Sequence, residues 1–188
     1  IATYCQELGI QYLTIYAFST ENWKRPKDEV DTLMNLLEQY LQEAIDTMER
    51  DYIRLRFFGD LSALSPELQA LAHRTDDISG HYDGFQANIC LNYGGRAEIL
   101  RAAQLCAAAG EDWTEENFSK YLWSAGIPDP ELIIRPSGEL RLSNFLLWQC
   151  AYSEFYFCDT LWPDFTRADL DKAIIDYQKR DRRFGGVK

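Results

Sequence analysis

Blocks of apolar residues along this chain predict strands and helices that follow one another in turn. Four short runs rich in β-branched and aromatic residues predict buried strands, at residues 10–17, 52–58, 85–91 and 132–134. Apolar residues at helical spacing predict helices between them, most clearly over residues 28–50 and 97–109. This alternation is typical of an α/β fold with a mainly parallel central sheet flanked by helices. Because no repeat, linker or low-complexity tract interrupts it, we expect a single domain over residues 1–188.

The longest helical pattern, residues 28–50, carries flexible apolar side chains along one face. Two interpretations fit this face: it packs into an ordinary core, or it forms one wall of an apolar tunnel. Periodicity does not separate them. For the tunnel, we expect Leu33, Leu36 and Leu37 to line the wall and Phe85 to form the floor.

Capping residues and turn signals predict the remaining elements. Asp28 is expected to cap the long helix, Ser65 a short helix that begins with Pro66, and Thr114 a helix that ends before Gly126. The polar stretch 75–84 predicts a loop. A fifth strand is expected at 151–158 and a last helix at 167–183. The chain opens inside a helical pattern, so we expect further sequence before Ile1.

Polar loops follow three of the predicted strands, at residues 18–26, 92–96 and 135–144. Ligands of open α/β sheets bind at the carboxyl ends of the strands, so these loops are expected at one edge of the sheet. The Gly94–Gly95 pair precedes a helix. It fits an anion-binding helix N-terminus and, equally well, a tight turn.

The loop at 135–144 offers the clearest chemistry. Arg135 and Arg141 stand close to Ser143, and Gly138 permits a tight turn. Guanidinium groups beside hydroxyl and backbone N–H groups suit a phosphate or diphosphate. Alternatively, the arginines form ordinary ion pairs with nearby acids, namely Glu131, Glu139 or Glu154.

The net charge of −11 argues against a general nucleic-acid binder, so an anionic ligand would need a local basic pocket. The five cysteines are odd in number and lack a C-x-x-C pair, which favours buried thiols in a reducing cytoplasm. The two histidines lack a third suitable neighbour, which disfavours a zinc site. No apolar run is long enough to span a membrane, and phosphate-loop, dinucleotide and nucleophile-elbow motifs are absent.

Several longer motifs carry a resemblance. They are AFSTENWKRP at 17–26, NYGGR at 92–96, IRPSGELRLSNFLLWQCAYSE at 134–154, WPDF at 162–165 and RRFGG at 182–186. In this order they resemble bacterial members of the cis-prenyltransferase family along the whole chain. The resemblance implies repeated condensation of isopentenyl diphosphate onto an allylic diphosphate such as farnesyl diphosphate. The expected product is a long polyprenyl diphosphate made in cis geometry.

The resemblance also implies roles for individual residues. Asn22 matches the family's proton acceptor, although an amide is a poor base and we interpret it as a positioner or relay. Glu154 matches a ligand of Mg²⁺, which fits an acid inside an aromatic strand. The residues expected to bind the substrates are Ser19, Thr20, Glu21, Trp23, Arg25, Arg135, Arg141, Leu142 and Ser143.

The chain departs from the family pattern at its start. The family's first strand, with its magnesium-binding Asp and its diphosphate-binding loop, is expected before Ile1. A smaller departure is Leu140, where bacterial members often have His. The resemblance further implies a homodimer with at most peripheral membrane contact. Two other interpretations stay open: a non-catalytic subunit of a prenyltransferase complex, and a phosphate-ligand binding module.

Overall fold

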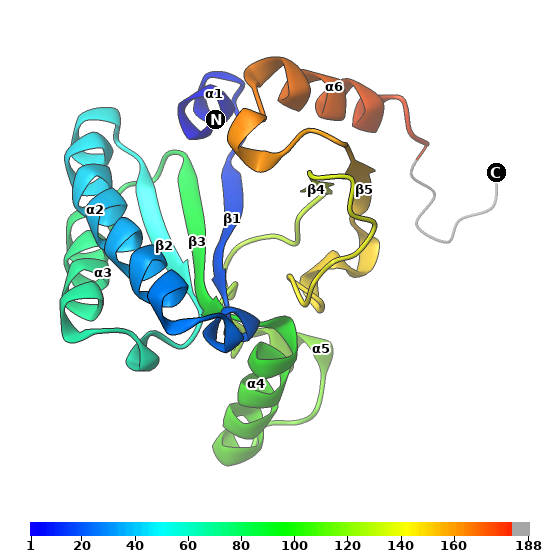
Figure 1. The fold of residues 1–188 in the computed structure, drawn as a ribbon. Coiled ribbons are helices and arrows are strands. Elements are labelled where there is room, and N and C mark those ends of the chain that lie inside the picture. Colours follow the sequence, from blue (N-terminus) through cyan, green and yellow to red (C-terminus); the bar gives the residue numbers. More distant parts are fainter. Residues whose placement is uncertain (182–188) are drawn as a thin grey trace. The chain divides into compact units, whose positions relative to one another are not determined.

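The computed structural model describes residues 1–181, except for the side chains of Asp46 and Glu49. These residues form two compact units, one over residues 2–125 and one that begins at Gly126 and includes Ile1. Each unit has a parallel sheet of its own (Figure 1). The RRFGG motif and the end of the helix predicted at 167–183 lie outside the described residues.

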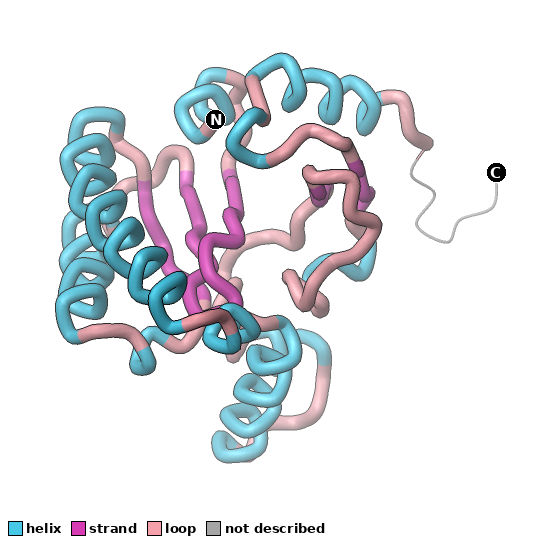
Figure 2. The backbone as a smooth tube through the Cα atoms, in the orientation of Figure 1, coloured by secondary structure: helices cyan, strands magenta, loops and turns pink. Residues whose placement is uncertain are grey.

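The sheet of the first unit contains the strands β1 (Tyr12–Ser19), β2 (Arg54–Phe58) and β3 (Gln86–Tyr93). Their order is β1-β3-β2, and both pairs are parallel (Figure 2). The central strand β3 is buried along nearly all its length. Because the strands are parallel, their carboxyl ends share one edge, so residues 18–26 and 92–96 lie at the same edge, as predicted. The loop at 135–144 was expected at this edge as well, but it follows a strand, Leu132–Arg135, that belongs to a separate sheet.

Five helices belong to this unit: α1 (Ala2–Glu7), α2 (Lys27–Asp51), α3 (Pro66–Ser79), α4 (Gly95–Ala109) and α5 (Glu115–Ser119). Side chains of α2 and α3 pack with the sheet in one apolar cluster that includes Phe18, Val30, Leu68 and Leu91. Leu33 and Leu37 pack against this cluster, whereas Leu36 is 40% exposed. Helices flanking a parallel sheet confirm the predicted α/β class.

Two local predictions about helices were wrong. The N-cap of α2 is Pro26, so Asp28 lies in the first turn instead of capping it. Residues 75–79 are helical rather than a loop, because α3 continues to Ser79. The hydroxyls of Thr75 and Ser79 donate to the carbonyl oxygens of Leu71 and Thr75, which satisfies them inside a buried helix turn.

The other caps were predicted correctly, although the element lengths differ. Ser65 caps α3, with Pro66 at its first position, and Thr114 caps α5 through the N–H of Asn117. The helix after Thr114 ends at Ser119, well before Gly126, and turns follow it.

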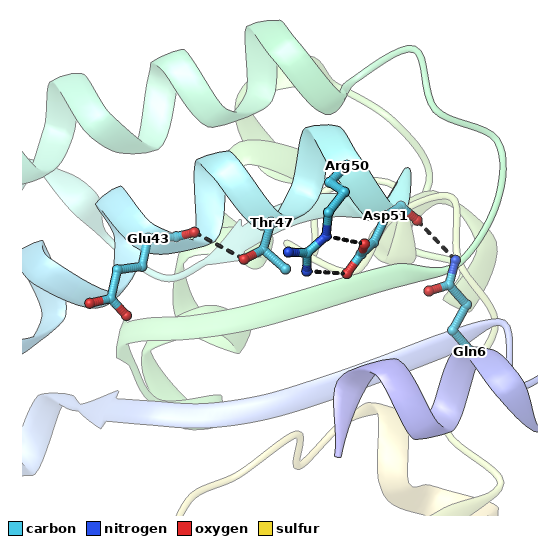
Figure 3. A network of polar contacts seen from close by, with 5 residues as sticks. All are labelled: Gln6, Glu43, Thr47, Arg50 and Asp51. Carbon is cyan, nitrogen blue, oxygen red and sulfur yellow. Dashed lines mark hydrogen bonds and ion pairs between the residues drawn. The ribbon is translucent and has the colours of Figure 1, made fainter.

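Polar contacts fasten α1 to the end of α2 (Figure 3). Nε2 of Gln6 donates to the carbonyl oxygen of Asp51 at 3.1 Å. Arg50 holds the carboxylate of Asp51 through two hydrogen bonds of 2.7 and 3.0 Å. One turn earlier, Thr47 donates to the carbonyl oxygen of Glu43. The end of α2, and with it the start of β2, is therefore tied to the first helix.

The second unit contains the strands β4 (Leu132–Arg135) and β5 (Glu154–Phe157), which are parallel, and the helix α6 (Arg167–Gln178). The strand predicted at 151–158 is shorter because residues Gln149–Tyr152 form a 3₁₀ turn. Helix α6 contacts β5. No helix among residues 1–181 combines the length and apolar character needed to cross a bilayer.

Candidate functional site

The loop after β1 carries most of the predicted site residues of the first unit. Residues Thr20–Lys24 form a short 3₁₀ helix directly after the strand. Oδ1 of Asn22 accepts a hydrogen bond from the backbone N–H of Ser19 at 2.7 Å. This contact folds the amide back onto its own loop and leaves Oδ1 already engaged. The geometry therefore agrees with a positioning role for Asn22 better than with a simple base.

The other side chains of this loop are mostly accessible. The Thr20 hydroxyl donates to Glu21 at 3.1 Å. Arg25 pairs with Glu29 one helical turn later, and both side chains are about half exposed. An exposed pair of this kind contributes little stability, so Arg25 can exchange Glu29 for a ligand at small cost.

Trp23 connects this loop to its neighbours. Its ring packs edge-on against Phe18, with 5.1 Å between the ring centroids. Its indole Nε1 donates to Oδ1 of Asn92 at 2.7 Å. Nδ2 of Asn92 in turn donates to the carbonyl oxygen of Asp60, also at 2.7 Å. Asn92, near the end of β3, thus links the loops that follow β1 and β2.

The N-terminus of α4 lies at the same edge of the sheet. Gly94 is its N-cap and supplies no side-chain cap, and Gly94 and Gly95 are both buried. Glu98, in the first turn, is fully buried; its carboxylate accepts from the Tyr93 hydroxyl and from the backbone N–H of Trp123. The negative charge of Glu98 already interacts favourably with the positive end of the α4 dipole, so no bound anion is needed there. The geometry therefore favours the tight-turn interpretation of the Gly94–Gly95 pair.

Tyr16 lies beside the N-terminus of α4 and is partly buried. The Tyr16 hydroxyl donates to the carbonyl oxygen of Tyr93 at 3.1 Å. Burial raises the pKa of Tyr16 above its usual value, and the nearby charge of Glu21 raises it further. Tyr16 therefore stays protonated and acts as a fixed hydrogen-bond donor at this end of β1.

The arginine loop of the second unit turns immediately after β4. Ser137 and Gly138 adopt left-handed conformations, with φ of 77° and 66°. Their N–H groups donate to the carbonyl oxygens of Thr160 and Cys158, at 2.8 and 2.9 Å. The predicted tight turn at Gly138 is confirmed. Both hydrogen bonds fasten the loop to the segment that follows β5.

The two arginines of this loop differ in their partners. Arg141 pairs with Glu139 at 2.5 Å, and its side chain is 62% exposed. Nε of Arg135 is buried and has no hydrogen-bond partner among the described residues. The predicted alternative of a local ion pair is therefore seen for Arg141, whereas Arg135 carries an unsatisfied donor. Beyond Leu142, Ser143 and Asn144 adopt left-handed conformations.

Glu154 is the first residue of β5, and the structure shows its partner. Its Oε2 lies 2.8 Å from Nη1 of Arg180, which also contacts Asp176 through Nη2. Hydrogen bonds to Glu154 and then to Asp176 raise the pKa of Arg180. The described residues contain no group of three or more His, Cys, Asp or Glu side chains that could hold a metal ion.

The predicted site residues thus fall into two groups. Ser19, Thr20, Glu21, Asn22, Trp23 and Arg25 share the loop after β1, while Arg135, Arg141, Leu142, Ser143 and Glu154 belong to the second unit. Sequence reasoning did not single out Asn92, Asp60 or Glu98 as individual site residues. Asn92 stood inside a recognised motif, but its contact with Trp23 joins positions 69 residues apart, which no local pattern reveals.

Comparison with known sequences identifies the relatives of this chain. The sequence model of a family described as "Putative undecaprenyl diphosphate synthase" matches residues 1–185. An isoprenyl transferase of Clostridium perfringens is 50% identical over 98% of this chain and 76% of its own length. One of Fusobacterium nucleatum is 50% identical, over 98% of this chain and 80% of its own length.

Solved structures give the same result. A probable undecaprenyl diphosphate synthase from Campylobacter jejuni superposes with a TM-score of 0.89 at 40% identity, over 96% of this chain and 86% of that one. Lavandulyl diphosphate synthase from Lavandula x intermedia, solved in complex with dimethylallyl diphosphate, gives a TM-score of 0.92 at 37% identity. That match covers 97% of this chain and 82% of the neighbour.

Proposed function

The chain belongs to the undecaprenyl diphosphate synthase family of prenyltransferases, and from this premise we propose that it condenses isopentenyl diphosphate with an allylic diphosphate in cis geometry. Repetition of the step yields a long polyprenyl diphosphate of the undecaprenyl type, the kind of lipid that carries cell-wall precursors. Farnesyl diphosphate is the proposed primer. The neighbour bound to dimethylallyl diphosphate supports an allylic diphosphate site in this fold.

The observation that carries the proposal is the polar loop after β4. Arg135 presents a buried Nε without a partner, and the cost of an unsatisfied buried charged donor indicates that a ligand completes it. Arg141 is exposed and pairs with Glu139, and Ser143 adds a hydroxyl two residues later. We assign Arg135, Arg141, Leu142 and Ser143 to the binding of isopentenyl diphosphate.

The loop after β1 is proposed to hold the reacting ends of both substrates. Ser19, Thr20 and Glu21 supply polar atoms, and Trp23 and Arg25 supply an aromatic face and a cation. Asn22 is proposed to position the proton that leaves isopentenyl diphosphate. Its Oδ1 is engaged by Ser19, so the amide orients a proton relay instead of acting as the base itself.

Magnesium is the proposed metal, and Glu154 its proposed protein ligand. Mg²⁺ is commonly held by one or two carboxylates together with substrate phosphates, so a single partly exposed carboxylate fits that mode. Bound magnesium would offset the negative charge of the departing diphosphate. Arg180, which now pairs with Glu154, adds positive charge at the same place.

Assembly and location complete the proposal. We propose one catalytic domain formed from both units, because a single family model matches residues 1–185. A homodimer through the aromatic surface around β5 is supported by the exposure of Phe157 and Trp162, at 38% and 48%. A cytoplasmic location is supported by five free cysteines. Membrane contact is proposed to be at most peripheral, for release of the product. Neither a non-catalytic subunit nor a phosphate-binding module gains support from the relatives.

A direct assay tests this function. The protein is incubated with farnesyl diphosphate, radiolabelled isopentenyl diphosphate and MgCl₂, and butanol-extractable products are separated by reversed-phase chromatography. We expect products that grow by five-carbon steps and depend on both the primer and the metal. Absence of labelled product from a folded protein at any primer length would contradict the proposal. A partner-dependent activity would instead support the non-catalytic subunit.

A further inference from the structure

We infer that Asn92 is a positioning residue of the condensation reaction, because it fixes Trp23 and through Trp23 the loop that carries Asn22. The inference rests on the proposed function for the role of that loop. The arrangement itself is a feature of the first unit: one buried side chain on β3 joins the loops after β1 and β2.

Both polar atoms of the Asn92 side chain make hydrogen bonds. Its exposed fraction is only 6%, and its oxygen and nitrogen each make a hydrogen bond of 2.7 Å. The oxygen accepts from the Trp23 indole and the nitrogen donates to the carbonyl of Asp60. Because an amide alone offers an acceptor and a donor on one short stem, neither Asp nor Leu could replace both contacts.

The backbone around Asn92 is equally specific. Its φ is 45°, a left-handed conformation that Asn tolerates better than most residues. The N–H of Asp60 donates to the carbonyl oxygen of Asn92 at 3.3 Å. Gly59 packs so tightly that a Cβ there would lie 1.8 Å from the carbonyl oxygen of Leu91. The loop after β2 is therefore locked against the end of β3, and it serves as a rigid base for Asn92.

Trp23, by contrast, needs an external anchor. It lies in a 3₁₀ turn, is 41% exposed and packs against Phe18 with one ring edge. Its indole N–H bond to Asn92 fixes the rotation that packing alone leaves open. Asn22 is the neighbouring residue, so a shift of Trp23 displaces the amide that bonds to Ser19. Small displacements of groups that orient a reaction reduce its rate strongly.

The key variant is Asn92→Gly, which keeps the left-handed backbone accessible and deletes both side-chain hydrogen bonds. We expect kcat to fall about tenfold while KM for isopentenyl diphosphate changes less than about threefold. Trp23→Phe removes the same bond from the other side and should have a similar effect. The double variant should have a kcat little lower than that of Asn92→Gly, because the Trp23–Asn92 hydrogen bond is already lost in each single variant.

A spectroscopic signature separates positioning from loss of stability. The chain has five tryptophans, so the ¹H–¹⁵N spectrum should contain five indole signals, and that of Trp23 is identified as the one missing in Trp23→Phe. In Asn92→Gly we expect this signal to move and its proton to exchange faster with solvent. Asn92→Asp, which retains an acceptor oxygen, should keep the signal near its wild-type position and recover part of kcat.

The matched control is Asn88→Ala on the same strand. Asn88 is fully buried and bonds to Thr14 and Gln86, near the amino end of β3 and away from the carboxyl ends of the strands. Its variant should lower the melting temperature yet leave kcat and the Trp23 signal unchanged. If Asn92→Gly loses the signal but retains wild-type kcat, or if its effects merely add to those of Trp23→Phe, the inference is overturned. If the wild-type protein makes no product, the proposed function fails instead, and the spectra still decide the geometry.

Discussion

Arg180 holds Glu154 in an ion pair, with 2.8 Å between Nη1 and Oε2, and both side chains are 30% exposed. The carboxylate proposed to bind magnesium is thus already paired with a cation that lies two residues beyond α6. An acid inside an aromatic strand needs a partner, as the sequence indicated, but the pattern did not show that Arg180 supplies it. A metal ion and Arg180 would share this carboxylate.

The first prediction follows from this shared carboxylate. Glu154→Gln should raise the magnesium concentration needed for half-maximal activity at least about tenfold, because a neutral amide is a weak magnesium ligand. If Arg180 competes with the metal for Glu154, Arg180→Ala should lower the magnesium concentration needed for half-maximal activity. The measurement is a magnesium titration of the initial rate. Glu131→Gln is the control, and an unchanged titration in Glu154→Gln would remove Glu154 from the metal site.

The second prediction concerns the arginine loop. Arg141→Ala should mainly raise KM for isopentenyl diphosphate, since a lost charge-assisted contact is worth about 1.5–3 kcal/mol, or about 10- to 150-fold. Stability should change little, because the Arg141–Glu139 pair is largely exposed. Arg50→Ala, which deletes an exposed arginine at the end of α2, is the matched control. Wild-type kinetics in Arg141→Ala would exclude Arg141 from the substrate site.

The third prediction tests the tight contact beneath Asn92. Gly59 has φ of 132°, and an added Cβ would collide with the backbone of β3. We expect Gly59→Ala to destabilise the protein by more than about 4 kcal/mol, as strained and overpacked sites do. Gly110→Ala is the control, because its Cβ meets open space and only its left-handed φ of 68° costs about 1–2 kcal/mol. Equal melting temperatures would contradict the close approach.

Local patterns predicted the elements of this fold well where the signal is itself local. Runs rich in β-branched and aromatic residues located the strands, although only β3 is buried along nearly all its length and β1 is mostly half-buried. Ser65 and Thr114 cap their helices because capping depends on residues three positions away. The prediction of a loop that begins at residue 75 was wrong, because residues 75–79 are helical. Their polar side chains suggested a loop, but the hydroxyls bond back to the helix and are buried against the sheet.

The sequence predicted which residue types form the candidate site, but it did not predict which residues they contact. Motifs located the loops, yet the bridge from Trp23 through Asn92 to Asp60 joins three separate segments, and the Asn92 conformation depends on packing against Gly59. The partner of Arg141 is a near neighbour in sequence, whereas that of Glu154 lies 26 residues away. Contacts set by tertiary packing have no signature in a single sequence.

The last prediction concerns α2 and the length of the product. The helix begins directly after the Ser19–Arg25 loop, and its 25 residues span about 38 Å, enough to line an extended prenyl tail. Leu33 packs against the apolar cluster near the start of α2, and Phe85 is buried just before β3, at the opposite end of the sheet from the site. If a tunnel runs between them, Leu33→Trp should shorten the products and Phe85→Ala should lengthen them.

Plain core residues would respond differently. Phe85→Ala would then cost about 3–5 kcal/mol of stability and leave the products unchanged. Phe118→Ala is the matched control, because Phe118 is also buried but belongs to α5 rather than to the α2 side of the sheet. Both variants should lower the melting temperature, and only Phe85→Ala should alter the chain lengths seen by chromatography. If the wild-type protein, Phe85→Ala and Phe118→Ala all give the same product distribution, Phe85 is a core residue and does not line a tunnel.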